Sequence, residues 1–237
     1  MLVKYWAKVQ HVTGSRRLPS NALLILIIFF LQLKKILPPV AKLQMDLHLT
    51  PNIIDGWNTA FTEIAFESRN EQSVYKLLRE FFECYAQFDF RSLIVCPYLG
   101  HPLERGEFMN VDNVPLDFYQ YKQNIKEGGC EMIFLNCILC VQDPFEHARN
   151  CAGPVRPPVA GEVIQLFRAA ADVCTNTLPH TVLNELLSPW SGQAPPAPPA
   201  PPPPCRADVP RGGRGDRSSR RKPRRARPYP TKKRHKI

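Results

Sequence analysis

Residues 73–88 read SVYKLLREFFECYAQF, and this stretch decides the fold class. Its apolar side chains recur every three or four residues, which is the spacing of one helical face. They are Val74, Leu77, Leu78, Phe81, Phe82 and Tyr85. Ser73 or Asn70 is suited to cap the helix, because its side-chain oxygen can accept a hydrogen bond from the first turn. We therefore predict an amphipathic helix that packs against other parts of the chain.

The remaining segments predict a mainly α-helical fold with a few short strands. Further helices are expected at residues 2–9, 20–33 and 163–174. Strand-like apolar runs at residues 92–98 and 133–141 flank a polar loop through residues 100–129, and residues 46–70 resemble a loop. The proline pairs at residues 38–39 and 157–158 should interrupt the chain.

Residues 22–31, ALLILIIFFL, form a wholly apolar run. They are too few for a membrane-spanning helix, which needs roughly 20 such residues. The run also resembles the core of a signal peptide, but the stretch before it is unusually long for that purpose. We expect a buried helix and no membrane association. A secreted or membrane-surface protein is the alternative.

The net charge of +10 is concentrated near the C-terminal end. Of the 31 lysines and arginines, 14 lie within residues 206–236, where only Asp208 and Asp216 oppose them. Residues 195–204 are all proline or alanine, which predicts a polyproline II spacer without a core. We predict a folded helical domain at residues 1–187, a Pro-rich linker at 188–205 and a disordered basic tail at 206–237.

A polycation of this density binds nucleic acid or anionic lipid without sequence specificity. Two clusters in the tail also resemble nuclear-import signals. The residues predicted to bind RNA or nuclear import receptors are Arg220, Arg221, Lys222, Arg224, Arg225, Lys232, Lys233 and Arg234. We expect a nuclear location, with the cytoplasm or the mitochondrion as alternatives. The simplest alternative for the tail is a solubilising extension.

The eight cysteines are not spaced like a disulfide framework. Cys137 and Cys140 lie in an apolar run, where a reduced thiol packs as a small hydrophobic group. Their spacing is half of a zinc site, but no second Cys pair or His pair follows at a fitting distance. We expect reduced thiols, a reducing compartment and no metal site.

Residues 143–146, Asp-Pro-Phe-Glu, end an apolar run with two carboxylates around a proline. Pro144 keeps Asp143 extended and is suited to open a helix. In one interpretation Asp143 is an N-cap and Glu146 is its N3 partner. In the other, both carboxylates bind a polar ligand at a helix N-terminus.

Lys4 and Lys8 also allow two interpretations. Lysines one turn apart on the polar face of a helix are usually just solvated. The pair, together with Ser20 at the start of the next helix, also supplies the two cations and the hydroxyl group that a triphosphate requires.

Five blocks together resemble the helical domain of noncanonical poly(A) polymerases and terminal uridylyltransferases. In chain order they are LVKYWAK at residues 2–8, SNAL at 20–23 with FFLQ at 29–32, PPV at 38–40, LLREFF at 77–82 and DPFE at 143–146. The resemblance covers residues 2 to about 175 and implies the helical domain of a nucleotidyltransferase. Residues 56–58 (Gly-Trp-Asn) and the basic tail are most similar to nuclear members, with mitochondrial members next.

The resemblance implies a nucleotide site. Lys4, Lys8 and Ser20 would contact the triphosphate of ATP or UTP, and Asp143 and Glu146 would lie near the edge of the base. RNA would be the other substrate. In the complete enzyme the reaction would use Mg²⁺ or Mn²⁺.

Two positions depart from the family pattern. Asn21 stands where a tyrosine usually stacks on the base, and such stacking is worth about 1–3 kcal/mol on single-strand platforms. Arg149 stands where uridylyl-specific members commonly have a histidine, and His147 is out of register. Asn21 and Arg149 therefore belong to the implied nucleotide site, but the choice between ATP and UTP stays open.

The catalytic carboxylates of the family do not occur in this sequence. Such polymerases hold two metal ions on an Asp-x-Asp pair that follows a Gly-Ser. Gly14 and Ser15 have no such pair after them, and Asp-x-Asp occurs nowhere in the chain. In the family these carboxylates precede the YWAK block, so we expect this chain to begin downstream of the catalytic palm domain. No catalytic or metal-binding residue is predicted.

The primary hypothesis is the C-terminal half of a template-independent RNA 3′-terminal nucleotidyltransferase, of the poly(A) or poly(U) type. It would bind NTP and RNA but be inactive alone. The alternative is a non-enzymatic RNA-binding or adaptor protein that uses the basic tail.

Overall fold

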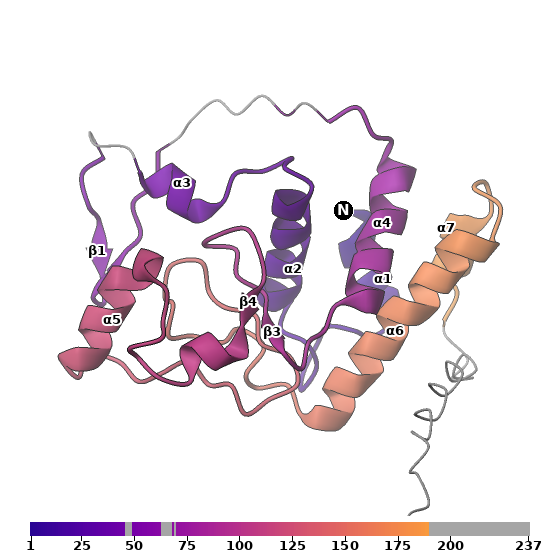
Figure 1. The fold of residues 1–237 in the computed structure, drawn as a ribbon. Coiled ribbons are helices and arrows are strands. Elements are labelled where there is room, and N and C mark those ends of the chain that lie inside the picture. Colours follow the sequence, from indigo (N-terminus) through magenta and orange to yellow (C-terminus); the bar gives the residue numbers. More distant parts are fainter. Residues whose placement is uncertain (46–48, 63–67, 69, 190–237) are drawn as a thin grey trace, which may run out of the picture. The chain divides into compact units, whose positions relative to one another are not determined.

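The computed structural model describes residues 1–45, 49–62, 68 and 70–189. The chain divides into two units, Met1–Ala197 and Pro198–Ile237, and all described residues belong to the first. This unit is mainly helical with short strands, as predicted (Figure 1). The predicted basic tail and all but the first two residues of the predicted linker lie outside the described residues.

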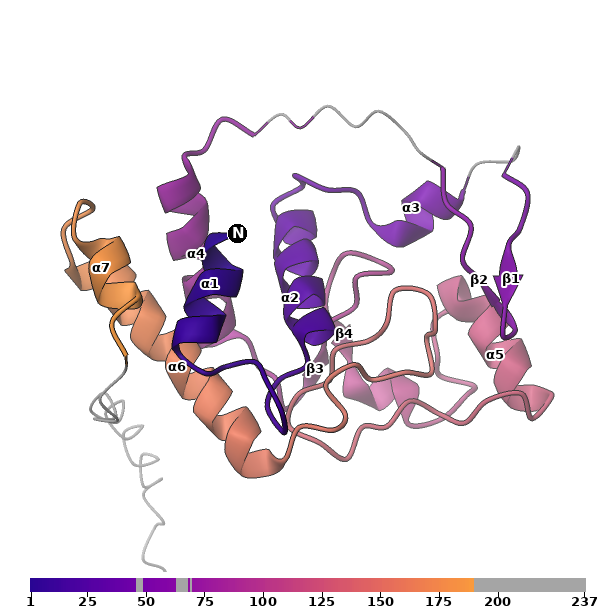
Figure 2. The ribbon, with the colours of Figure 1, turned by 180° about the vertical axis from the view of Figure 1, so that it is seen from behind.

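The first part of the fold is a group of helices around one hydrophobic core, here called the helical core. These helices are α1 (Leu2–Val9), α2 (Ser20–Leu33), α4 (Val74–Gln87), α6 (Pro157–Asn176) and α7 (Val182–Leu186). Figures 1 and 2 show α4 beside α6. The rings of Trp6 and Tyr85 lie 5.7 and 5.4 Å from the ring of Phe167, so aromatic packing joins α1 and α4 to α6.

α4 confirms the amphipathic helix predicted from residues 73–88. The Ser73 hydroxyl accepts a hydrogen bond from the Lys76 amide at 3.2 Å, so Ser73 is the cap. Asn70 instead accepts one from the Gln72 amide. The side chains buried by α4 are Leu78, Phe81, Phe82 and Tyr85, four of the six apolar positions of the predicted face.

α2 confirms that the apolar run at residues 22–31 is a buried helix. Half of its 14 residues are buried, and the Tyr85 hydroxyl donates to the Leu26 carbonyl at 2.5 Å, which ties α4 to α2. Among the helices of the described residues, none has both the length and the apolar character needed to cross a membrane.

The second part of the fold surrounds a separate hydrophobic cluster, here called the second core. Its elements are α3 (Val40–Gln44), β1 (Ile53–Ile54), β2 (Trp57–Asn58), β3 (Leu93–Ile94), β4 (Leu103–Glu104), η1 (Arg105–Phe108), η2 (Leu116–Phe118) and α5 (Tyr119–Lys126). β1 pairs with β2 and β3 pairs with β4, both antiparallel. Trp57, Phe118 and Tyr121 are the large aromatic residues near its centre.

Residues 94–96 and 139–141 form the wall between the two cores. Val95 pairs with Val141 in a parallel bridge, and the Val95 amide donates to the Cys140 carbonyl at 3.0 Å. Because side chains of an extended segment alternate, neighbouring residues enter different cores. Val95, Leu139 and Val141 enter the helical core, whereas Ile94, Cys96 and Cys140 enter the second core.

Three segments differ from the secondary structure predicted for them. The polar loop predicted through residues 100–129 contains η1, η2 and α5. Of the strand predicted at residues 133–141, only Val141 pairs with another segment. Of the strand predicted at 92–98, two residues form β3 and Val95 adds the bridge. The runs are only partly buried, and side chains such as those of Arg105 and Asn150 bond to several of their backbone groups where a ladder was expected.

The last long helix was predicted too short. α6 spans Pro157–Asn176, and Pro157 and Pro158 open it instead of interrupting the chain. The first residues of a helix need no amide partner, and the φ angle of proline suits a helix start. The short helices α3 and α7 were not predicted.

The cysteines of the described residues are all free thiols. They are Cys84, Cys96, Cys130, Cys137, Cys140, Cys151 and Cys174. Burial raises the pKa of Cys96 and of Cys140 to about 12, so these thiols stay protonated and pack as hydrophobic groups.

Candidate functional site

Residues 143–149 form a tight turn, here called the acidic turn. One carboxylate oxygen of Asp143 accepts hydrogen bonds from the amides of Phe145 at 3.0 Å and Glu146 at 3.1 Å. These are the bonds of an N-cap, as one interpretation of the sequence required. No helix follows, however, so the predicted helix start at Pro144 was wrong.

The chain returns instead of continuing as a helix, because both ends of the turn are paired. Gln142 and Asn150 form an antiparallel bridge, and the Asp143 amide donates to the Arg149 carbonyl at 3.0 Å. The Arg149 amide in turn donates to the Glu146 carbonyl at 2.8 Å. A helix would break these bonds.

The acidic turn presents charged side chains to solvent. Arg149 Nη1 lies 3.4 Å from Glu146 Oε2, and the two side chains are 56% and 46% exposed. An ion pair this exposed contributes about 0–1 kcal/mol, so a ligand can replace either partner at little cost. The second carboxylate oxygen of Asp143 lies 3.5 Å from the Cys151 thiol.

The side chain of His147 is buried and holds the acidic turn against the aromatic rings of the second core. Its ring is 7% exposed and lies 5.6, 4.3 and 4.9 Å from the rings of Trp57, Tyr98 and Phe118. Burial lowers the pKa of His147 to about 4, while the Pro144 carbonyl and the charge of Asp143 act in the opposite direction. Neither ring nitrogen makes a hydrogen bond of normal geometry with a described residue. His147 is therefore a neutral, buried residue at pH 7.

Asn150 closes the acidic turn, and the sequence did not mark it as important. Its side-chain oxygen accepts from the amides of Val141 at 3.0 Å and Ala152 at 2.9 Å. Its nitrogen donates to the carbonyls of Phe134 and Leu139 at 3.2 and 3.1 Å. One buried amide thus joins three segments of backbone. Only the folded chain brings these partners together.

Arg105 supports the segment before the acidic turn, and this role was not predicted from the sequence. Its guanidinium group donates to four backbone carbonyls at 2.6 to 2.8 Å. The acceptors are Phe90, Leu135, Cys137 and Ile138. The planar fork of arginine suits this many acceptors, whereas the ammonium group of lysine does not.

Lys4 and Lys8 lie on the exposed face of α1, and Trp6 and Ala7 anchor the opposite face. Within the described part of the chain, neither lysine forms an ion pair. Their charges therefore remain available to an anion.

Ser20 and Asn21 are the first two residues of α2, and both side chains are exposed. Pro19 precedes them, and no side chain caps this end of α2. The first amides of a helix can therefore be offered to a negatively charged ligand beside the serine hydroxyl.

The predicted nucleotide-binding residues thus fall into three local groups. Asp143, Glu146 and Arg149 share the acidic turn, the two lysines share α1, and Ser20 and Asn21 share the start of α2. In the described residues no hydrogen bond or ion pair connects one group to another, so a common cleft stays a prediction. The eight tail residues predicted to bind RNA or import receptors lie outside the described residues.

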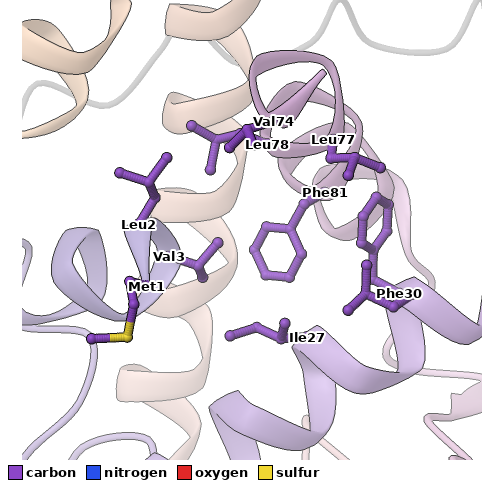
Figure 3. Close-up of a pocket in the computed structure, with 10 residues that line it drawn as sticks. Met1, Leu2, Val3, Ile27, Phe30, Val74, Leu77, Leu78 and Phe81 are labelled. Carbon is purple, nitrogen blue, oxygen red and sulfur yellow. The ribbon is translucent and has the colours of Figure 1, made fainter. Parts of the chain in front are cut away.

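An apolar pocket of about 230 Å³ lies between α1, α2 and α4 (Figure 3). Val3, Ile27 and Phe81 point toward one another there. All its lining side chains are apolar, so it provides no group to hold a triphosphate.

The described residues also do not fit the metal ions that nucleotidyl transfer requires. No three His, Cys, Asp or Glu side chains in the described part of the chain are grouped so that they could hold a metal ion. Glu146 is paired with the cation Arg149, and the Asp143 carboxylate is engaged by two backbone amides.

Residues 73–149 match the family model of the Cid1 family poly A polymerase. The chain is 34% identical over 199 residues to the speckle targeted PIP5K1A-regulated poly(A) polymerase of Xenopus tropicalis, covering 79% of this chain and 22% of the relative. For the Homo sapiens protein of the same name, the identity is 30% over 180 residues, with coverages of 73% and 18%. The mitochondrial poly(A) RNA polymerase of Drosophila melanogaster is 30% identical over 147 residues, with coverages of 55% and 24%.

Two solved structures share the fold. A Cid1 poly(U) polymerase mutant bound to MgATP has a TM-score of 0.60 at 22% identity, covering 80% of this chain and 53% of that one. The structure of mtPAP in complex with UTP has a TM-score of 0.61 at 20% identity, with coverages of 80% and 38%.

The chain spans about a fifth of the length of the curated speckle-targeted relatives that it matches. The acidic turn falls within the matched region, residues 73–149. The chain therefore belongs to the noncanonical poly(A)/poly(U) polymerase family.

Proposed function

We propose that this chain is the nucleotide- and RNA-binding helical half of a template-independent RNA 3′-terminal nucleotidyltransferase. The acidic turn carries the proposal, because its backbone hydrogen bonds bring two carboxylates and a guanidinium group together within seven residues. Buried His147 and Asn150 hold the turn in place. The Asp143 carboxylate is needed to close the turn, whereas the side chains of Glu146 and Arg149 reach solvent and make no contact that the turn requires.

In this function, Lys4 and Lys8 neutralise the triphosphate, and the Ser20 hydroxyl donates to a phosphate oxygen. The carboxylates of Asp143 and Glu146 accept hydrogen bonds from the adenine amino group or from uracil N3–H. Arg149 donates to a ring nitrogen or a carbonyl oxygen of the base. This set of groups accommodates either ATP or UTP.

Titration of the full chain with fluorescent ATP and UTP analogues tests the nucleotide site. Replacing Lys4 and Lys8 together by alanine should weaken binding about tenfold or more, because two charge-assisted contacts are lost. Lys42→Ala is the matched control, since Lys42 is also an exposed helical lysine. Equal affinity in both variants would disprove the proposed site.

Replacing Asp143 and Glu146 by Asn and Gln separates base recognition from triphosphate binding. The ratio of ATP to UTP affinity should change, while the affinity for inorganic triphosphate stays the same. An unchanged ratio would show that the base binds away from the acidic turn.

We also propose that the chain alone does not transfer nucleotides, because its sequence has no Asp-x-Asp pair to hold the catalytic metals. The relatives named above bind MgATP or UTP as longer proteins. Incubation with an RNA primer, Mg²⁺ or Mn²⁺ and each NTP should give no extension. Clear extension of the primer would contradict this part of the proposal.

A second function is favoured by the charge of residues 206–236, which suits a non-enzymatic RNA-binding or adaptor protein. Measuring RNA affinity at several salt concentrations distinguishes the two. If deletion of residues 206–237 abolishes RNA binding and NTP does not bind, the adaptor function holds. NTP binding that depends on Lys4 and Lys8 favours the polymerase half.

The proposed location is the nucleus. It is supported by the basic clusters at residues 220–225 and 232–234 and by the names of the speckle-targeted relatives, while the Drosophila relative leaves the mitochondrion as the alternative. A fluorescent fusion of the full chain should enter the nucleus, and replacing both clusters by glutamine should prevent this. Mitochondrial fluorescence would contradict the proposal.

A further inference from the structure

A polar cavity of about 370 Å³ lies outside the predicted nucleotide site. It is formed by the C-terminal end of α4, by residues 88–91 and by the first part of α6, which Figure 1 shows side by side. We call it the α4–α6 pocket. Its volume lies at the lower end of the range for small-ligand sites, about 300–1,000 Å³.

The lining of the α4–α6 pocket combines apolar side chains with positively charged ones. Phe88, Ile138 and Ile164 contribute apolar surface, and Arg91 and Arg168 contribute guanidinium groups. Both arginine side chains are exposed. Such a combination suits a ligand with a flat apolar part and an anionic part.

The two arginines make few contacts with the rest of the protein. Within the described residues neither forms an ion pair, and Arg168 makes only a long contact, 3.4 Å, from Nε to the Ala86 carbonyl. The Nη groups of Arg168 therefore remain available to a phosphate, and so does the side chain of Arg91.

Asp89 is the one acidic residue of the pocket lining, and its carboxylate is already occupied. It accepts hydrogen bonds from the amides of Arg91 at 3.0 Å and Ser92 at 3.3 Å. Hydrogen bonds from Ser92 and from the Arg91 amide lower the pKa of Asp89, so it is ionised at neutral pH. It offsets one positive charge, and the pocket lining keeps a net positive charge.

We propose that the α4–α6 pocket binds one nucleotide of a single-stranded RNA, with its phosphate on Arg91 and Arg168 and its base against Phe88 and the two isoleucines. This proposal rests on the proposed function, because it takes RNA as the polymer that the chain binds. Arginine–phosphate contacts supply affinity without sequence preference, and an aromatic or apolar surface accepts any base. A base in a duplex is already stacked and cannot enter, so the pocket selects single strands.

Photo-crosslinking of the full chain tests the proposal. A single-stranded RNA that contains 4-thiouridine is irradiated with the protein, and crosslinked peptides are identified by mass spectrometry. We expect crosslinks within residues 86–91 and 161–168, and we expect a duplex of the same sequence not to compete for them. Crosslinks to the basic tail serve as the internal standard.

The double variant Arg91→Gln with Arg168→Gln should lose the pocket crosslinks and keep those of the tail. Arg16→Gln with Arg156→Gln is the matched control, because these two arginines are exposed and lie outside the pocket. Relative to the control variant, the slope of log affinity against log salt concentration should become shallower in the test variant by about 0.7 for each lost phosphate contact. Circular dichroism checks that both variants are folded.

Crosslinks confined to the tail in the wild-type protein would overturn the proposal, and so would pocket crosslinks that survive in the folded test variant. If an acidic peptide binds the pocket and RNA does not, the partner is a protein and the proposal is also overturned. Failure of NTP binding at Lys4 and Lys8, with pocket crosslinks present, would count against the proposed function and not against this site.

Discussion

At the scale of single residues, Arg105 should stabilise the fold through its four hydrogen bonds to backbone carbonyls. Replacing it by lysine keeps the charge but leaves most of its four carbonyl acceptors without a donor. Because each charge-assisted hydrogen bond contributes about 1.5–3 kcal/mol and some are retained, we expect a loss of about 2–4 kcal/mol. Urea unfolding measures this loss. Arg156→Lys, at an exposed position, is the control, and an equal effect of both changes would contradict the role of Arg105.

His147 predicts how stability depends on pH. Its pKa is lowered to about 4 in the folded protein, whereas an unfolded histidine titrates near pH 6.5. Between these values the unfolded chain binds more protons, so the free energy of unfolding falls as the pH falls. The expected loss from pH 7 to pH 5 is about 2 kcal/mol.

His147→Leu, which has nearly the same volume and cannot ionise, should remove this part of the pH dependence. Urea unfolding of both proteins at pH 7, 6 and 5 measures it. Parallel pH curves for the two proteins would show that His147 is not the responsible group.

At the scale of elements, the same substitution should have opposite effects at two glycines. A Cβ added at Gly161 in α6 would meet no atom within 4 Å, so Gly161→Ala should stabilise the helix by about 0.5–1 kcal/mol. Gly100 has φ +73° and its Cβ would lie 3.0 Å from Pro39 Cβ. Gly100→Ala should destabilise by about 1–3 kcal/mol. Thermal unfolding followed by circular dichroism measures both, and a shift of the same sign would refute the explanation.

At the scale of the whole molecule, the wall of residues 94–96 and 139–141 should make the two cores unfold together. Val141 is fully buried, and Val141→Ala should cost about 2 kcal/mol. Native-state hydrogen exchange should then show equal losses of protection in α4, from the helical core, and in α5, from the second core. The control Leu183→Ala, at an exposed site, should change neither. A loss confined to α4 would show that the cores unfold independently.

Much of the fold was predictable because helix periodicity and capping are local. Ser73 was one of two candidate caps, and the bounds of α1 and α2 agree with the sequence patterns. Pro157 was misread, because a proline can end one segment or open a helix and only the path of the chain distinguishes the two cases. The loop at residues 100–129 concealed α5, whose mostly polar sequence lacks a clear apolar face.

The candidate site was predictable only in part. Local sequence was enough to place Lys4 with Lys8 on α1. An N-cap was one of its two interpretations of Asp143, and the hydrogen bond from the Glu146 amide agrees with it. The bridge between Gln142 and Asn150 turned the expected helix into the acidic turn. Partners of this kind are set by folding, because a buried backbone group must find a donor or an acceptor wherever the chain brings one. Periodicity within a segment therefore determines the helices, while long-range hydrogen bonding determines the shape of the surface that they support.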